Sequence, residues 1–523
     1  VTALGKDAGR STQGHRFEAP KAPVEIAHAD DYARCLSSDG AVIVSFAERR
    51  ADIVRQLDAA CARIGEGVHV VEDDALLDEV TALVERPNVL VCAFEAQYLE
   101  VPQECLILTM KANQKYFPLL DAEGKLSNRF LIVSNVSPAD PSAVIGGNER
   151  VIRPRLSDAR FFYDQDRKKT LHSRIAQLGR VVYHNKLGSQ GDRMERVRAI
   201  AKGIASQLGD AALVDTVDVA AQLAKTDLVT DMVGEFPELQ GTMGAYYARH
   251  DGLGDAVAMA IEDHYKPRFA GDALARDTAG LVLALADKLE TLVGMFGIGS
   301  LPTGEKDPFA LRRHALGVIR MLVERALPLR PEVLVRDAFA VFPDGMLQHD
   351  VEPLTQFLAE RLKGYLKDGG YSNGEVEAAI HAQGMQTWAE LPRRLDAVRA
   401  FAALPQAPAL AAANKRISNI LKKVPPVDPH VSEVLLTEPA EVALYAAMRE
   451  HAPVAAAQFD ADDFTASLQT LAQLRAPVDA FFESVMVNAP EMDLRLNRLG
   501  LLQALHDAMN RVADLSRLDS GAA

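Results

Sequence analysis

The side chains best suited to chemistry gather between Gly146 and Asp166. This stretch carries four arginines and an aromatic run, namely Arg150, Arg153, Arg155, Arg160 and Phe161–Phe162–Tyr163. Guanidinium groups beside aromatic rings can bind phosphates and stack on bases. The same composition also suits a seam between two domains, in which the arginines pair with nearby acids such as Glu149, Asp158, Asp164 and Asp166. The residues alone leave both interpretations open.

Several short patterns resemble catalytic motifs but lack the context that catalysis needs. The segment 299–306 has the glycine spacing of a phosphate loop, yet Glu305 stands in place of the lysine. Arg16–Phe17–Glu18 fits an ATP-holding Arg-x-Glu element, but no downstream glycine-rich strand ending in arginine completes such a site. No partner histidines lie at metal-ligand spacing from the dipeptides His250–Asp251, His349–Asp350 and His506–Asp507. The sequence therefore predicts no self-sufficient active site.

Composition sets the broad class of the protein. A length of 523 residues, 48% apolar and 25% charged, predicts a soluble globular protein of about three or four domains. The net charge of −15 argues against generic binding to nucleic acids or anionic membranes, so any contact with RNA must use local basic patches. The four cysteines form no CxxC pair, which is typical of reduced thiols in a cytosolic protein.

The first part of the chain, residues 1–165, has the pattern of an α+β domain. Short apolar runs predict strands at 41–46, 88–94, 105–110 and 130–134. Apolar residues at helical spacing predict helices over 51–65 and 75–84. Short β-rich runs that alternate with helices are typical of this fold class.

Nearly everything after residue 166 shows helical periodicity. We expect helices at about 167–186, 190–208, 211–228, 240–249, 253–264, 277–296 and 307–328. Further helices fill 329–405, and a second helical unit begins near 406 and ends in a frayed tail at 516–523. The predicted fold is multidomain and mainly α, with parts at 1–165, 166–328, 329–405 and 406–523.

Five strings of this sequence are long and specific enough to identify a family. They are Thr109–Pro118, Asn148–Asp166, Ala224–Gly241, Tyr265–Asp272 and Asp307–Arg313. They resemble the β subunit of bacterial heterotetrameric glycyl-tRNA synthetase, and the resemblance covers essentially the whole chain. Subunits of this family extend further at the N-terminus, so we expect this chain, which begins with Val1, to lack that region.

The resemblance implies a division of labour between two subunits. A separate class II α subunit would make glycyl-adenylate and hold ATP and Mg²⁺. This chain would bind tRNA(Gly) within an α2β2 heterotetramer in the cytoplasm, with no cofactor, metal or membrane contact of its own. The implied activity is glycine–tRNA ligation by an aminoacyl-tRNA synthetase whose adenylate site lies on the partner.

The resemblance also implies an HD-type fold for residues 166–328, followed by a helical linker. The metal-binding His–Asp pair of HD hydrolases aligns with Thr226–Asp227, and their later acid aligns with Asp287. Threonine is a poor metal ligand beside imidazole. We therefore expect both aspartates to cap helices or to pair with Lys288 or an arginine. A metal-dependent phosphohydrolase is the alternative function, and a purely structural scaffold for the α subunit is a third.

Basic residues of the HD-type domain are candidate contacts to tRNA. Arg312 and Arg313 fall on a helix expected to begin at Asp307–Pro308. Phosphate contacts of this kind position RNA without reading its sequence, although each residue can equally be a solvated helix-end charge. The candidates outside the last domain are Arg150, Arg153, Arg155, Arg249, Arg268, Arg312 and Arg313, with Arg249 and Arg268 in predicted loops.

Three strings of the last domain, at 413–422, 481–482 and 494–499, resemble the helical anticodon-binding module shared with arginyl-tRNA synthetase. Lys415, Asn419 and Lys422 share one face of the predicted helix, while Ile417, Ile420 and Leu421 turn toward the core. That face, together with Arg416, is a candidate tRNA contact. A solvated charged face is the alternative, and Arg495 and Arg498 can instead hold their helix to its neighbour.

Overall fold

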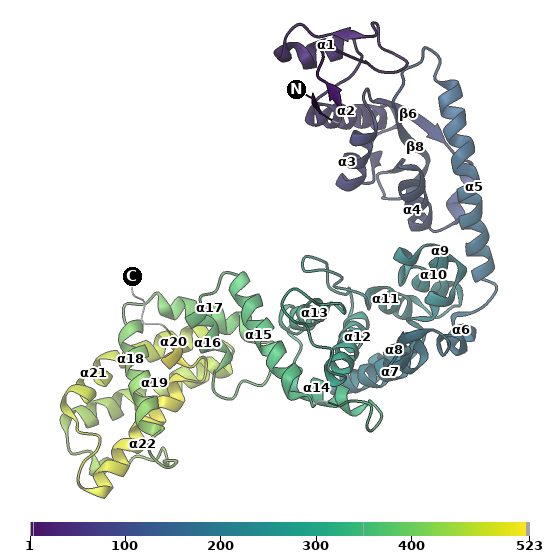
Figure 1. Ribbon diagram of the computed structural model, residues 1–523. Helices are drawn as coiled ribbons and strands as arrows, with labels where there is room; N and C mark the ends of the chain where they lie inside the picture. Colours follow the sequence, from purple (N-terminus) through teal and green to yellow (C-terminus); the bar gives the residue numbers. More distant parts are fainter. Residues whose placement is uncertain (1, 4, 349, 519–523) are drawn as a thin grey trace. The chain divides into compact units, whose positions relative to one another are not determined.

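The computed structural model describes residues 2–3, 5–348 and 350–518, and it is mainly helical, as predicted (Figure 1). His349 and the end of the predicted tail, 519–523, lie outside these residues. The chain forms two compact units: unit 1 comprises Val1–Arg174 and Thr226–Leu253, and unit 2 comprises Ile175–Lys225 and Gly254–Ala523. The division into four parts stays a prediction.

Unit 1 contains a four-stranded antiparallel sheet. Its order is β5 (His69–Val70), β7 (Phe117–Leu120), β8 (Leu126–Ser134) and β6 (Asn88–Ala93). The helices α2 (Phe46–Ile64) and α3 (Asp74–Leu83) share a core with this sheet. In that core Ile53 and Val80 of the helices join Leu119 and Leu131 of the strands, all at most 4% exposed. The strands predicted at 88–94 and 130–134 are confirmed.

Two of the predicted strands are wrong. Residues 41–45 form no ladder, because Ser45 caps α2 by accepting a hydrogen bond from the Glu48 N–H, and Phe46 already begins the helix. Residues 105–110 lie inside α4 (Gln103–Gln114). The buried side chains of α4, namely Cys105, Leu106, Thr109 and Met110, recur at helical rather than alternating spacing.

Two-stranded pairs β1–β2 (Thr2–Ala3, Lys6–Asp7) and β3–β4 (Ser11–Thr12, Val24–Glu25) precede α1 (Tyr32–Ser38).

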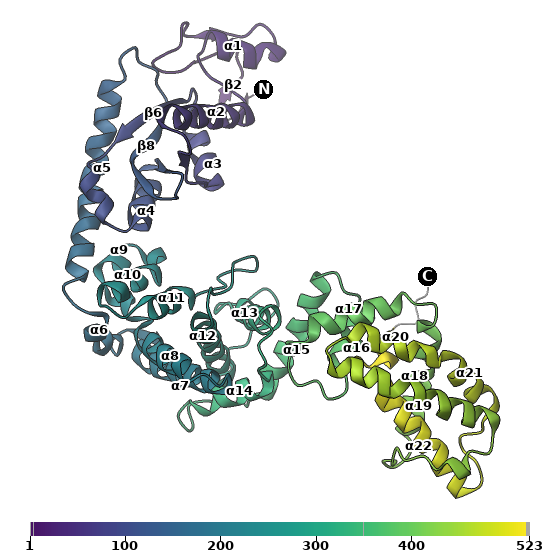
Figure 2. The same cartoon turned by 180° about the vertical axis from the view of Figure 1, so that it is seen from behind.

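The arginine-rich stretch that the sequence singles out forms one long helix, α5 (Ser142–Asp166), which runs beside β6 and α4 (Figures 1 and 2). Ile152, Leu156 and Ala159 make its buried face. Asp166 at its end is buried and accepts hydrogen bonds from the Met232 N–H and the Tyr247 hydroxyl, both at 2.9 Å. The end of α5 is thereby fixed to α9 (Asp231–Glu235) and α10 (Thr242–His250) of the same unit.

Unit 2 is built around α12 (Thr278–Gly297), in which every residue after Thr278 is buried. The helices that pack against it are α7 (Gln190–Gln207), α8 (Ala211–Leu223), α11 (Asp255–Asp263), α13 (Leu311–Glu324), α14 (Pro331–Ala340) and α15 (Glu352–Asp368). The prediction of one helix over 167–186 is wrong. Its helix, α6, covers only Leu171–Leu178, and a hairpin of β9 (Val182–His184) and β10 (Gly188–Ser189) follows.

The helices in the C-terminal part of unit 2 share a hydrophobic core of their own. These helices are α16 (Asn373–Ile380), α17 (Leu391–Ala402), α18 (Ala407–Leu421), α19 (Pro439–Asp460), α20 (Phe464–Leu471), α21 (Arg475–Ser484) and α22 (Met492–Met509). Phe401, Phe481 and Leu501 are at most 1% exposed in this core.

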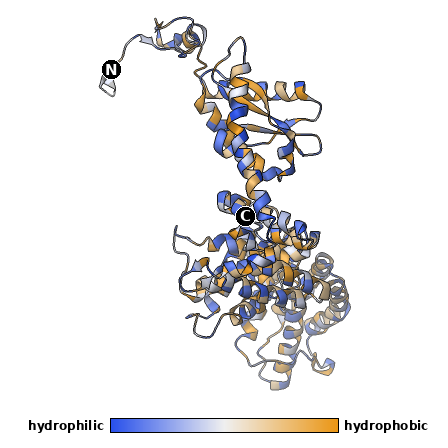
Figure 3. Cartoon of the chain, turned by 90° about the vertical axis from the view of Figure 1, so that its right-hand side faces the viewer, coloured by the Kyte–Doolittle hydropathy of each residue, from blue (hydrophilic) through white to orange (hydrophobic). Residues whose placement is uncertain are grey.

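None of the described helices is long and apolar enough to cross a membrane. Hydrophilic residues interrupt the hydrophobic ones along the helices (Figure 3).

Candidate nucleic-acid interface

Three of the predicted arginines line a single groove of about 670 Å³ in unit 2. Arg268 lies in the loop that follows α11, and Arg312 and Arg313 lie in the first turn of α13. We call this site the arginine groove. Its lining comprises Arg268, Phe269, Ala270, Arg312, Arg313, Leu316, Arg361, Gly364, Tyr365 and Asp368.

A helix cap and several polar contacts hold the walls of the arginine groove in place. The Asp307 carboxylate accepts the backbone N–H groups of Leu311 and Arg312 at 2.8 and 3.0 Å, so Asp307 caps α13 although the helix begins at Leu311. Arg320 of α13 donates to the carbonyls of Ala270 and Asp272 and so fixes the loop. The Tyr365 hydroxyl donates to Glu324 at 3.1 Å and ties α15 to α13.

The four arginines of the groove are electrostatically uncompensated. Among the described residues, no carboxylate forms an ion pair with Arg268, Arg312, Arg313 or Arg361. Arg312 donates to the Gly304 carbonyl at 2.7 Å and Arg313 to the Arg268 carbonyl at 3.4 Å, while the guanidinium carbon of Arg361 lies 5.7 Å from the centre of the Phe357 ring. A guanidinium carries five N–H donors, so most of them remain available to an anion. The groove is therefore suited to phosphate.

Among the lining residues that sequence reasoning did not identify, Arg361 and Phe269 are the two best suited to contact RNA. Arg361 comes from α15, and only the packing of α15 on α13 brings it beside Arg312 and Arg313. Phe269 is 61% exposed and directly follows Arg268. The same adjacency of arginine and phenylalanine drew attention to Arg160–Phe161, so it was a usable signal at Phe269 as well.

Arg249 does not belong to the groove's unit. It lies in the last turn of α10 in unit 1 rather than in a loop, so its predicted loop position is wrong.

The arginines of α5 divide into paired and unpaired members. Arg153 donates to Glu95 at 2.6 Å. Arg160 pairs with Glu100 at 3.1 Å and also with Asp164, one of the expected nearby acids, at 3.7 Å. Arg150 donates to the Gly146 carbonyl at 3.2 Å. Arg155 is exposed and forms no ion pair with a carboxylate of the described chain. Phe161 is 57% exposed, so it does not pack in a core.

The two aspartates at the HD positions have structural partners, as expected. In unit 1, the Asp227 carboxylate accepts the N–H groups of Gly241 and Gly244 at 2.6 and 3.1 Å and so caps α10. In unit 2, Asp287 pairs with Arg193 and Lys225, both at 3.1 Å, and not with Lys288. Thr226 is fully buried in unit 1.

Asp287 belongs to a group of buried charges that we call the buried cluster. Glu290 is 0% exposed and accepts from Arg193 at 2.9 Å and from Arg196 at 2.8 Å. Burial alone would raise the pKa of Asp287, but Arg193 and Lys225 outweigh it and hold that pKa well below its usual range.

Two further ionisable groups belong to the buried cluster. Burial lowers the pKa of Lys288 to about 8. Burial, followed by the nearby Lys288, lowers the pKa of His314 to about 4. A metal ion does not fit beside Asp287, because two cationic side chains already contact its carboxylate.

The predicted basic face of α18 is present. Lys415, Asn419 and Lys422 are exposed on it, and Ile417 is fully buried behind it. Arg416 stacks on Phe482, with its guanidinium carbon 4.3 Å from the ring centre. Arg498 pairs with the fully buried Glu441, so it holds α22 to α19, as the sequence suggested.

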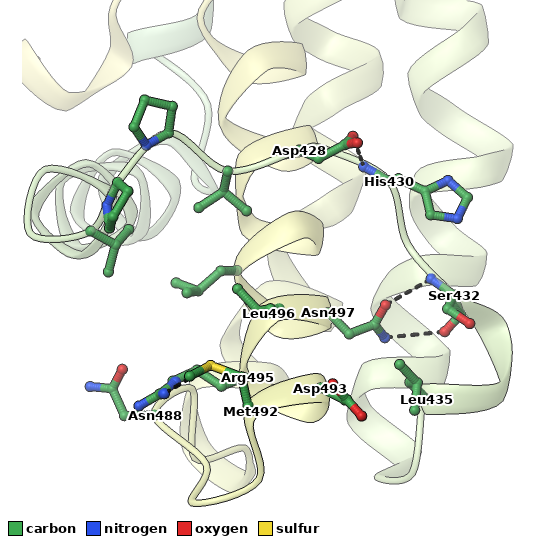
Figure 4. Close-up of a pocket in the computed structure, with 15 residues that line it drawn as sticks. Asp428, His430, Ser432, Leu435, Asn488, Met492, Asp493, Arg495, Leu496 and Asn497 are labelled. Carbon is green, nitrogen blue, oxygen red and sulfur yellow. Dashed lines mark hydrogen bonds between the residues drawn. The ribbon is translucent and has the colours of Figure 1, made fainter.

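A pocket of about 690 Å³ begins immediately after the basic face of α18 (Figure 4). Leu435, Met492 and Leu496 supply apolar lining, and Asn488 and Arg495 add polar groups. Asn497 closes one side by bonding to the backbone of Ser432, accepting its N–H at 2.7 Å and donating to its carbonyl at 3.1 Å. Sequence reasoning did not identify this pocket.

Comparisons with known proteins cover almost the whole chain. The family described as "Glycyl-tRNA synthetase beta subunit" matches residues 1–381, and the family described as "DALR anticodon binding domain" matches residues 410–515. The arginine groove lies within the first match, and the basic face of α18 with its pocket lies within the second.

Individual relatives agree with the family matches. The glycine–tRNA ligase β subunit of Polaromonas naphthalenivorans is 68% identical over 99% of this chain and 73% of its own length. Those of Acidovorax ebreus and Thiobacillus denitrificans are 67% and 62% identical, each over 99% of this chain and 74% of their own lengths. The chain belongs to the family of glycyl-tRNA synthetase β subunits.

Proposed function

We propose that this chain is the tRNA-binding β subunit of a glycine–tRNA ligase and positions tRNA(Gly) for glycyl transfer. The observation that carries the proposal is the arginine groove: four arginines without carboxylate partners in the described chain, within a protein of net charge −15 that belongs to this family. Uncompensated guanidinium groups at one site favour a polyanion locally, although the whole chain repels it.

The adenylate chemistry belongs to a separate α subunit in this proposal. That subunit binds ATP and Mg²⁺, and two copies of each chain form an α2β2 heterotetramer in the cytoplasm. Fixing the tRNA 3′ end beside the adenylate makes acyl transfer effectively unimolecular, an effect that can lower the barrier by about 7–11 kcal/mol. The work of this chain is to bind and orient the RNA.

Two surfaces of this chain contact the tRNA. The arginine groove lies in the part that we assign to an HD-type domain (166–328) and a helical linker (329–405), and it contacts backbone phosphates. The basic face of α18 and the adjoining pocket lie in the anticodon-binding part (406–523) and contact the anticodon arm. The matched anticodon-binding family supports this assignment. Arg150, Arg155 and Arg249 of unit 1 are additional candidate contacts.

The phosphohydrolase alternative has no observation in its favour. Asp287, which aligns with the later metal-binding acid of HD hydrolases, forms ion pairs with Arg193 and Lys225, and Asp227 caps α10. A pure scaffold for the α subunit differs from the proposal only in having no affinity for RNA.

Two assays on the purified chain test the proposal. The chain should bind tRNA(Gly) with an affinity that falls as salt rises, and it should show no ATP–pyrophosphate exchange until the α subunit is added. Exchange by the chain alone would place the adenylate site here and overturn the division of labour. Binding of the α subunit without any binding of tRNA would favour the scaffold.

A further inference from the structure

One side chain of the arginine groove is not explained by phosphate binding. Phe269 lines the groove together with the four arginines and exposes 61% of its surface. An exposed phenyl ring loses the hydrophobic stabilisation that burial would give it, and a groove for phosphates alone has no use for it. An exposed aromatic ring in a groove that also carries arginines is the combination by which proteins bind single-stranded nucleic acid.

We propose that the arginine groove holds the unpaired 3′ tail of the tRNA, with one base stacked on Phe269 and the flanking phosphates bound by Arg312, Arg313 and Arg361. This inference rests on the proposed function and sharpens it. Stacking needs a base whose face is free, and the faces of bases inside a double helix are covered by their neighbours. Phe269 therefore selects a single strand over a stem.

Charge argues against a protein partner for this groove. Four arginines and one aspartate, Asp368, leave a net charge of +3 on the lining. An apolar peptide that covered Phe269 would also remove these guanidinium groups from water without a counter-charge, which costs several kcal/mol per ion. A phosphodiester strand carries one negative charge for each base, so its bases can stack on Phe269 while its phosphates neutralise the arginines.

The position of the groove in the sequence indicates which single strand binds. Its lining runs from Arg268 to Asp368, whereas the anticodon-binding family matches residues 410–515. The anticodon loop is thus assigned to other residues. Outside that loop, the 3′ tail is the unpaired segment of a tRNA that ends freely and can enter an open groove.

The test combines one protein change with one RNA change. We would measure the dissociation constants of the wild-type chain and of Phe269→Ala and Phe269→Trp for intact tRNA(Gly) and for the same tRNA cut back to its paired acceptor end. Phe269→Ala should weaken binding of intact tRNA by about tenfold, because base–aromatic stacking contributes roughly 1–3 kcal/mol. Binding of the shortened tRNA should not change, and Phe269→Trp should keep the wild-type affinity for both.

Phe161→Ala is the matched control: Phe161 is 57% exposed beside Arg160, whose guanidinium is already paired with Glu100 and Asp164, so this variant should not affect either RNA. Equal losses for intact and shortened tRNA in Phe269→Ala would overturn the inference. So would no loss for either RNA, and in that case the proposed function would stand because the wild type still binds tRNA. Failure of the wild type to bind either RNA would instead overturn the proposed function.

Discussion

The buried cluster and the arginine groove place the same side chain in opposite electrostatic states. In the buried cluster, Arg193 and Arg196 share Glu290 at 2.8–2.9 Å, and both are less than 10% exposed. In the groove, Arg312, Arg313 and Arg361 form no ion pair with a carboxylate of the described chain. Both sites lie in unit 2. Their residues come from α12 itself, from helices that pack against α12 and from the loop after α11.

This difference separates arginines that stabilise the fold from arginines that are free to bind. A guanidinium already held by a buried carboxylate cannot move to a phosphate without leaving that carboxylate uncompensated. A guanidinium bonded only to carbonyls keeps its full charge for a ligand. Loss of a charge should therefore lower stability in the buried cluster and lower RNA affinity in the groove.

The largest effect should come from Glu290→Gln. Loss of this carboxylate leaves Arg193 and Arg196 buried with too little negative charge, so the free energy of unfolding should fall by about 3–5 kcal/mol. Chemical denaturation measures this. The matched control is Asp78→Asn, which removes one of the two carboxylates that pair with the half-exposed Arg50 and should cost at most about 1 kcal/mol. Similar losses in the two variants would show that burial does not separate the sites.

Acid should affect the buried cluster next most strongly, through His314. Its pKa is about 4 in the folded chain and about 6.5 when unfolded, so the unfolded chain binds the proton first. Stability is therefore fully present above about pH 6.5 and is lost as the pH falls toward 4. Relative to His314→Gln, the wild type should lose about 2–3 kcal/mol over this window. Parallel stability curves for the two proteins would contradict this assignment.

A smaller effect is expected from Arg361→Ala, which tests the groove residue that sequence reasoning missed. Removal of one phosphate contact should weaken tRNA binding about fivefold at about 0.15 M salt. The unfolding free energy should stay the same, since Arg361 is exposed and forms no ion pair with the described carboxylates. A loss of stability without a loss of tRNA affinity would show that Arg361 stabilises the fold and does not bind tRNA.

The smallest effects should come from α5, because this helix carries both an arginine paired with a carboxylate and an arginine without such a partner. Arg153 is held by Glu95, so Arg153→Ala should leave tRNA affinity unchanged. Arg155 has no such partner, and Arg155→Ala should weaken binding by about twofold if α5 contributes one peripheral phosphate contact. The reverse order of effects in a tRNA titration would show that ion pairing in the free chain does not predict availability.

The sequence predicts the parts of this molecule that depend on local pattern. The helices over 190–208 and 277–296 were identifiable because their apolar residues recur at helical spacing, and they correspond to α7 and α12. Arg312 and Arg313 were recognisable because the capping Asp307 lies just before them. The strand predicted at 105–110 was wrong because a short apolar run fits a buried helix as well as a strand.

The remaining features depend on contacts between distant segments. The partner of Arg153 is Glu95, 58 positions away, while nearby acids such as Asp158 suggested a local pair. Arg361 joins Arg312 only because α15 packs on α13. No periodicity encodes such pairings, so the division of arginines into paired and unpaired classes could not be read from the sequence.

The most direct test of the central claim is the salt dependence of tRNA binding by Arg312→Ala combined with Arg313→Ala. If both arginines contact phosphates, the slope of log affinity against log salt should become shallower by roughly 1.4–1.8, because each contact contributes about 0.7–0.9. The thermal stability of the variant should match that of the wild type. An unchanged slope would contradict the account, because it would mean that the uncompensated arginines of the groove do not bind tRNA.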